Sequence, residues 1–362
     1  MKKTIKFLII ILLFILVISF IGYLLLLNGA DIIGFGKNKV VDYDRKANIW
    51  GNTVAGNSSK SKLDEMNIDY NQTNLLLSAY DFSRGMVNKE YEDAEQVMDT
   101  YTYLYEIKNG YEKETYEDEP YIIPYLVDNS DLAVIVICGG GFGYKSMDGA
   151  TNEGKEIADT LNRNGFNAFV LHYRSNPYEY PIPYLDLQRA IRYIRFHSED
   201  YHINKDKISL IGFSAGGNEI GTFINKIQGK DFFPENYIKD EIDLIDDKVN
   251  SAAMIYPLLS FRSNIPMLFC LFNDDDIRDE KKRNEILEMT DLYRNISSQD
   301  VKQFIAYGTN DNIVGMDEAK KYIEYVKNEG TDVTVVEAQN QDHCFSQEHY
   351  MNEYIEWLKN NI

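Results

Sequence analysis

Hydrophobic and polar positions divide the chain into three parts with different patterns. Near the N-terminus, an uncharged run from Phe7 to Leu27 is rich in Leu, Ile and Phe. Residues 28–99 are polar, lack sustained periodicity and include a stretch rich in Gly, Ser and Lys. From residue 100 onward, short apolar runs alternate with segments whose apolar residues recur at helical spacing. The pattern predicts a membrane-spanning segment at 1–27, a tether at 28–99 and a folded domain at 100–362.

Strands and helices alternate through the third part, as in an α/β protein with a doubly wound, mostly parallel sheet. The run Leu132–Ile137 is apolar throughout, which is typical of a central strand covered on both faces. Further strands are predicted at Tyr101–Ile107, Tyr121–Val127, Asn167–Tyr173, Lys207–Ile211, Ser251–Tyr256, Gln303–Tyr307 and Asp332–Glu337. Helices are predicted at Glu153–Asn164, Leu185–His197, after Ser214, at Met316–Asn328 and at Gln347–Asn360, with a charged insertion at Asp274–Asp300. Short helices at Asn74–Tyr80 and Glu90–Met98 are compatible with the tether.

The apolar run near the N-terminus is long enough to cross a membrane. At about 1.5 Å per residue it reaches about 30 Å, the thickness of the hydrocarbon core. Lys2, Lys3 and Lys6 precede it, which places the N-terminus in the cytoplasm and the rest of the chain outside. Asn28-Gly29-Ala30 is a poor match to a signal-peptidase site. We therefore predict a single-pass signal-anchor with an extracellular domain; a cleaved, secreted form and a buried core helix are the alternatives.

Composition narrows the classes of partner. A formal net charge of −20 argues against nucleic acid, because phosphate binding needs clustered Lys and Arg. Three widely separated cysteines fit neither a disulfide framework nor a zinc site. The run Asp274-Asp275-Asp276 lacks the spacing of a calcium loop. We expect no metal, no cofactor and no nucleic acid.

A nucleophile motif follows one of the predicted strands. Gly212, Ser214 and Gly216 form a G-x-S-x-G pattern between the apolar strand at Lys207–Ile211 and a helix. Such a serine sits on a strained turn that projects its hydroxyl above the sheet, and the glycines allow strand and helix to approach. Ser214 is the predicted nucleophile; a Gly-rich turn with an idle serine is the alternative.

A triple glycine follows another predicted strand. Acyl transfer needs backbone N–H groups aimed at the oxyanion on the attacked carbonyl. We assign Gly140 and Gly141 as loop donors, with Ala215, the residue after the nucleophile, as the other donor. A phosphate-binding loop is the rival interpretation, but neither G-K-[ST] nor a helix-opening G-x-G-x-x-G is present.

Aromatic residues near this loop are candidates for substrate binding. Phe142 and Tyr144 follow the glycines directly. Tyr178, Tyr180 and Tyr184 are compatible with a sugar-stacking rim, but tyrosine is abundant in this chain and ordinary packing is the favoured interpretation.

A serine nucleophile needs a base, and the base needs an orienting carboxylate. In this fold class the order along the chain is serine, acid, histidine. Only His343 and His349 follow Ser214. His343 lies in a loop after the last predicted strand and is the predicted base, whereas His349 falls in the final predicted helix.

The predicted acid is Asp311, directly after the strand at Gln303–Tyr307. Asp342 is adjacent to the histidine in sequence and is expected to point elsewhere. Asp317 begins a helix, where an acidic residue commonly favours the dipole.

These motifs together resemble the α/β-hydrolase esterases, in particular bacterial acetylxylan esterases and xylanase-associated esterases. The resemblance runs from about residue 100 to the end, through Tyr121–Val127, Ala133–Gly143, Phe169–Arg174, Pro181–Arg195, Ile208–Gly217, Tyr256-Pro257, Gly308–Val314 and Asp342–Phe345. It implies an α/β-hydrolase fold with Ser214, Asp311 and His343 as a triad. Cys138, Cys344 and Gly315 depart from residues common in the family, and none of them removes a catalytic group.

The expected activity is serine carboxylic-ester hydrolysis on a short acyl ester, such as acetylated carbohydrate. Two alternatives remain at this point. One is a peptidase of the same fold, which usually carries an added propeller domain that the tether is too short to form. The other is an idle hydrolase-fold protein used for adhesion or binding, although such proteins have usually lost a triad member and this sequence retains all three.

Overall fold

The computed structural model describes residues 2–33, 45–57, 84, 85, 87, 89, 119–143, 145, 153–176, 178–293 and 300–361. Within the first helix, side chains are described for residues 5–23. The predicted strand at Tyr101–Ile107 and the short helices at Asn74–Tyr80 and Glu90–Met98 lie outside these ranges.

The centre of the molecule is one sheet of eight described strands, in the order β1-β2-β4-β3-β5-β6-β7-β8. The pairs β1–β2 and β2–β4 are antiparallel, and the remaining pairs are parallel. The prediction of an α/β fold with a mostly parallel sheet is therefore confirmed. The strands are β1 (Ala47–Asn48), β2 (Tyr121–Tyr125), β3 (Ala133–Ile137), β4 (Asn167–His172), β5 (Ile208–Phe213), β6 (Ser251–Ile255), β7 (Lys302–Gly308) and β8 (Val333–Ala338).

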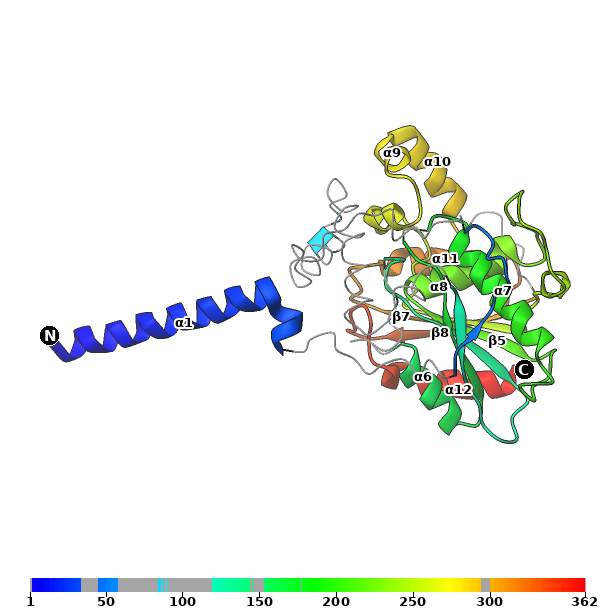
Figure 1. Cartoon of the computed structure of the whole chain (residues 1–362), viewed down its shortest axis with the longest axis horizontal. Helices are drawn as coiled ribbons and strands as arrows, with labels where there is room; N and C mark the ends of the chain where they lie inside the picture. The colour runs from blue at the N-terminus through cyan, green and yellow to red at the C-terminus, as the bar shows by residue number, and fades with distance from the viewer. Residues whose placement is uncertain are drawn as a thin grey trace.

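Helices cover both faces of this sheet (Figure 1). One face packs against α7 (Ile182–Phe196), α8 (Ala215–Thr222) and α11 (Met316–Asn328), and the other packs against α6 (Lys155–Arg163) and α12 (Met351–Asn360). Along β3, Ala133, Ile135 and Ile137 enter the first core while Val134 and Val136 enter the second. This alternation explains why the whole strand is apolar.

The charged insertion forms α9 (Asp274–Arg278) and α10 (Glu280–Thr290). Asn273 caps the first of these helices and Asp279 caps the second. Short turns of π- or 3₁₀-helix lie at Phe223–Ile227, Ile242–Leu244, Ile265–Cys270 and Gln347–His349. His349, predicted in the final helix, lies in the last of these turns.

The N-terminal helix α1 (Lys2–Ile33) contains a stretch, Ile5–Tyr23, that is long and apolar enough to cross a membrane. This stretch is not buried by other parts of the protein. Such a helix serves either as a secretion signal or as an anchor.

Residues 45–57, called the strap below, belong to the folded domain and correct the prediction of a continuous tether at 28–99. Its strand β1 pairs with β2, and Ile49, Trp50 and Ala55 are buried. The Trp50 indole N–H donates to Asp186 at 2.8 Å. The Trp50 ring also lies under the guanidinium of Arg189, at 5.0 Å from the ring centroid. The strap is too short and irregular to show a local pattern, so sequence periodicity does not reveal it.

Buried arginines of the domain depend on strap carbonyls. Arg174 donates to the Ala55 carbonyl at 2.8 Å and also forms a two-point ion pair with Asp186, at 2.6 and 2.9 Å. Arg189 donates to the Ile49 carbonyl at 2.7 Å. Removing the strap would leave part of each buried guanidinium without an acceptor, which is costly.

We predict that a chain beginning at residue 58 is less stable than one beginning at residue 45 by about 3 kcal/mol or more, because it loses the burial of Trp50 and the acceptors for two arginines. Trp50→Ala in the longer chain has a similar cost, about 3 kcal/mol. Urea unfolding followed by circular dichroism measures both differences. Equal unfolding free energies for the two chains would show that the strap contributes nothing to the domain.

Candidate active site

Ser214 lies on a strained turn between β5 and α8. Its backbone has φ 49 and ψ −112, a region that costs a non-glycine residue about 1–3 kcal/mol. Hydrogen bonds hold the residue in place: its N–H donates to the Ile255 carbonyl at 3.0 Å, and its carbonyl accepts from Leu258 at 3.1 Å. The strain is therefore balanced by contacts with β6 and with the segment that follows it.

Glycines around the turn are required by close packing. A Cβ on Gly216 would lie 2.3 Å from the Ile137 carbonyl oxygen, and one on Gly212 would lie 2.5 Å from the Gly216 oxygen. Both distances are shorter than any side chain tolerates, so the helix reaches the strand end only with glycine at these positions.

The imidazole of His343 lies beside the serine hydroxyl, with Nε2 2.9 Å from Oγ of Ser214. His343 follows β8, and its loop is fixed to the loop after β7. Asn310 N–H donates to the Gln341 carbonyl at 3.0 Å, and a Cβ on Gly308 would lie 2.4 Å from the same oxygen. This tight contact brings the ends of β7 and β8 together.

Asp311 completes the chain of hydrogen bonds. One carboxylate oxygen lies 2.7 Å from Nδ1 of His343, and the other accepts N–H bonds from Ile313 and Val314 at 3.0 and 3.1 Å. Burial raises the pKa of Asp311, but the hydrogen bond and charge of His343 outweigh burial and hold that pKa below its usual value. Asp311 is therefore ionised and fixed toward the imidazole.

The surroundings of His343 make its imidazole a stronger base. Burial lowers the pKa of the imidazole, but the neighbouring Cys344 and Asp311, through charge and hydrogen bonding, outweigh burial and raise that pKa above its usual value. With Nδ1–H donated to Asp311, the neutral ring presents its Nε2 lone pair to the Ser214 hydroxyl.

The triple-glycine loop begins where β3 ends and lies against the nucleophile. Gly140 and Gly141 have φ values of 127 and 62, which favour glycine, and the Gly143 N–H closes the turn on the Gly140 carbonyl at 3.0 Å. A Cβ on Gly139 would lie 2.9 Å from Cβ of Ser214. The loop predicted to carry the oxyanion donors thus directly contacts the serine turn.

Of the two candidate substrate-binding aromatics, the structure describes Phe142, which lies in the core. Phe142 is fully buried and packs against Tyr173, Tyr184 and Phe261, so its ring supports the loop from within the core. This placement gives no support to direct contact between Phe142 and a substrate. Tyr144 lies outside the described residues.

The tyrosines considered as a sugar-stacking rim take part in packing. Tyr178 and Tyr184 are buried, and the Tyr184 hydroxyl donates to Asn218 at 2.9 Å. Tyr180 is partly buried and stacks on Phe272. The favoured interpretation from sequence, ordinary packing, agrees with these contacts.

Sequence reasoning missed Glu153, a buried carboxyl group just before α6. It accepts hydrogen bonds from the N–H of Gly139 and from the hydroxyl of Tyr256. An acidic residue before a helix is ordinarily taken as a favourable charge for the helix dipole. No local signal distinguishes Glu153 from that common case.

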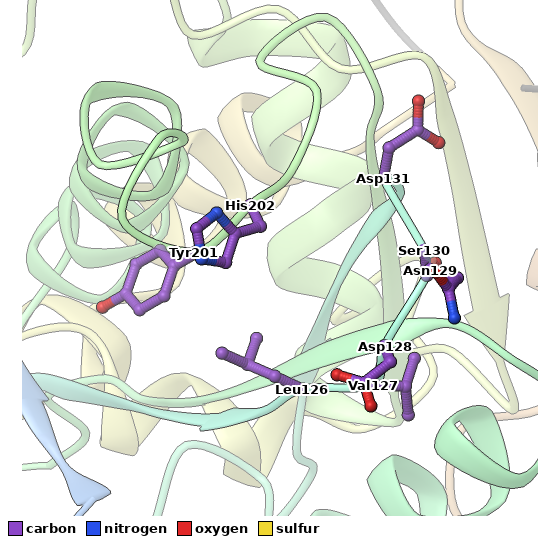
Figure 2. A pocket seen from close by; sticks show the side chains of 8 residues that line it. All are labelled: Leu126, Val127, Asp128, Asn129, Ser130, Asp131, Tyr201 and His202. Carbon is purple, nitrogen blue, oxygen red and sulfur yellow. The ribbon is translucent and has the colours of Figure 1, made fainter.

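A separate hollow of about 730 Å³ lies far from the serine along the strand direction. It is lined by Leu126, Val127, Asp128, Asn129, Ser130, Asp131, Tyr201 and His202 (Figure 2). These residues precede β3 and β5, so the hollow is at the amino ends of the parallel strands, whereas Ser214 follows the carboxyl end of β5.

Among the described residues, no three His, Cys, Asp or Glu side chains gather to hold a metal ion, and a metal-free site stays a prediction.

Comparison with known proteins agrees with the predicted resemblance. The BD-FAE family model matches residues 123–258. An acetylxylan esterase of Xylanibacter ruminicola is 34% identical over 98 residues, which are 27% of this chain and 20% of that protein. Endo-1,4-beta-xylanase B of Butyrivibrio fibrisolvens is 34% identical over 110 residues, 28% of this chain and 16% of that protein. The chain thus spans about a fifth or less of the length of these relatives.

Solved structures share the fold. The acetyl ester-xyloside bifunctional hydrolase of Caldicellulosiruptor lactoaceticus matches with a TM-score of 0.57 and 24% identity, over 67% of this chain and 86% of that one. A truncated carbohydrate esterase from gut microbiota matches with a TM-score of 0.53 and 19% identity, over 67% of this chain and 90% of that one. The predicted resemblance is confirmed: this chain has the α/β-hydrolase fold, and its residues 123–258 match the BD-FAE family model.

Proposed function

We propose that this protein is a serine carboxylic-ester hydrolase in which Ser214 is the nucleophile, His343 the base and Asp311 the orienting acid. The observation that carries the proposal is the continuous relay from Ser214 Oγ to His343 Nε2 at 2.9 Å and from Nδ1 to Asp311 at 2.7 Å. These distances lie within the range in which a base takes a proton from a hydroxyl group.

In the proposed reaction, Ser214 Oγ attacks the carbonyl carbon of an ester while its proton passes to His343 Nε2. The tetrahedral intermediate collapses, and His343 returns the proton to the departing alcohol oxygen. Water then attacks the acyl-serine in the same way and releases the carboxylic acid. Asp311 keeps Nδ1 protonated and stabilises the imidazolium in both steps.

In the proposed site, the N–H groups of Gly140, Gly141 and Ala215 donate hydrogen bonds to the oxyanion of the tetrahedral intermediate. Within the described part of the chain, these groups donate to no protein acceptor, whereas the Gly139 N–H is already bonded to Glu153. Donors that are fixed before the reaction stabilise the developing charge most effectively.

The proposed substrate is a short acyl ester on a carbohydrate, acetylated xylan being the first candidate. The names of the relatives support this class: one is an acetylxylan esterase and the other a xylanase. The proposed location is outside the cell, with α1 as a single-pass anchor. The apolar helix preceded by Lys2 and Lys3 supports this arrangement.

Replacing the nucleophile gives the direct test. We expect Ser214→Ala to lower kcat/KM for an aryl acetate by about 10⁴-fold or more, because the hydroxyl attacks the carbonyl carbon. Initial rates are measured on the full chain in detergent. Ser130→Ala, at the opposite edge of the sheet, is the matched control and keeps wild-type rates. Equal non-zero rates for the Ser214 variant and wild type would disprove Ser214 as the nucleophile, and no turnover by the wild-type chain would disprove the esterase function and favour a binding role.

The carbohydrate preference has its own test. We expect acetate release from acetylated xylan to exceed release from a simple aryl acetate at equal ester concentration, since the relatives act in xylan breakdown by name. An enzymatic acetate assay on the wild-type chain measures both. Faster release from the aryl ester would be consistent with the proposed esterase activity but would exclude acetylated xylan as the preferred substrate.

A further inference from the structure

Glu153 is a buried carboxyl group that the proposed mechanism does not use. Only 2% of the residue is exposed. One carboxyl oxygen accepts from the Gly139 N–H at 2.6 Å, and the other accepts from the Tyr256 hydroxyl at 2.9 Å. A buried carboxyl group is costly unless its contacts compensate, so both of these contacts matter.

On one side, Glu153 fixes the start of the glycine loop. A Cβ on Gly139 would lie 2.9 Å from both the Glu153 oxygen and Ser214 Cβ, and 2.8 Å from the Phe213 carbonyl. Gly139 is therefore clamped between the carboxyl group and the serine turn. The next residues, Gly140 and Gly141, are the proposed oxyanion donors, whose effect depends on placement within fractions of an ångström.

On the other side, Glu153 reaches the base through Tyr256. This tyrosine follows β6, and its N–H donates to the Ala306 carbonyl at 2.7 Å. Its ring lies edge-on to His343, with ring centroids 5.1 Å apart. One carboxyl group therefore contacts both the loop that would hold the oxyanion and the residue that packs on the imidazole.

The charge of Glu153 also acts on the imidazole. The pKa of Glu153 is raised, because burial outweighs the bonds from Gly139 and Tyr256 and the charge of His343, all of which lower it. Among the described residues, the other titratable groups that face this pair are Asp311, Cys344, Tyr256 and Tyr350. Glu153 is thus a second carboxyl group, beside Asp311, that favours a positive charge on His343.

We propose that Glu153 is a positioning residue for both halves of the site: it fixes the oxyanion loop through Gly139, holds Tyr256 against His343, and shares its negative charge with the imidazolium formed during turnover. The inference rests on the proposed esterase function.

The test is Glu153→Gln. In one orientation the amide keeps both contacts, accepting from Gly139 and donating to the Tyr256 oxygen, and it removes only the charge. Because a nearby negative charge stabilises the imidazolium, its loss lowers the pKa of His343. The acidic limb of the plot of kcat/KM against pH then moves to lower pH by about half a unit or more. We expect kcat to fall about 10-fold while KM changes much less.

Two further variants complete the experiment on the full chain. Glu156→Gln removes an exposed charge from the first turn of α6, three residues after Glu153, and keeps the wild-type kcat and the wild-type acidic limb of the pH profile. Tyr256→Phe keeps the ring but removes the hydroxyl. Like Glu153→Gln, this variant is expected to lower kcat and to move the acidic limb of the kcat/KM pH profile to lower pH. If the Gln variant does not fold, as judged by circular dichroism, Tyr256→Phe carries the test.

An unmoved acidic limb in the folded Glu153→Gln variant, or in Tyr256→Phe when it carries the test, would overturn the proposal. A ¹⁵N NMR titration of His343 in the same variants reports its pKa without any substrate. A wild-type chain without esterase activity would therefore defeat the proposed function alone, while the titration would still decide the role of Glu153.

Discussion

The site depends on the close approach of helix α8 to the end of strand β3. Gly216 meets the Ile137 carbonyl where no Cβ fits, and this contact fixes the position of the helix start. The sharp turn at Ser214 follows from that position, because β5 must pass directly into α8 within a few residues. The hydroxyl is therefore projected above the sheet by backbone geometry, and Ser214 is held in a strained conformation before any substrate binds.

The other groups of the relay reach the serine because parallel strands end at the same edge of a sheet. Asp311 follows β7 and His343 follows β8, and the contact between Gly308 and Gln341 ties these two loops together. The surroundings then set the charge state: the pKa of Asp311 is held down and that of His343 is held up. This combination keeps the acid ionised and makes the imidazole ready to accept a proton.

The parts predictable from sequence are those with a local pattern or a fixed chain order. The apolar run of β3 and the glycines around Ser214 are local, while the order of serine, acid and histidine selects Asp311 and His343 from the many Asp residues and the five histidines. The strap and Glu153 escape such reasoning because their contacts are distant in sequence. Trp50 meets Asp186 from 136 residues away, and Glu153 meets Tyr256 from 103. The sequence makes Phe142 a candidate for substrate binding, and it carries no signal for the full burial of this loop side chain.

The central claim is that His343 activates the hydroxyl of Ser214. It is tested most directly by treating the full chain with a fluorophosphonate, which forms a stable adduct with an activated serine, and mapping the labelled peptide by mass spectrometry. The account predicts one adduct, on Ser214, whose rate of formation falls at least about 100-fold in His343→Ala. Labelling at another residue, or an equal rate without the imidazole, would contradict it.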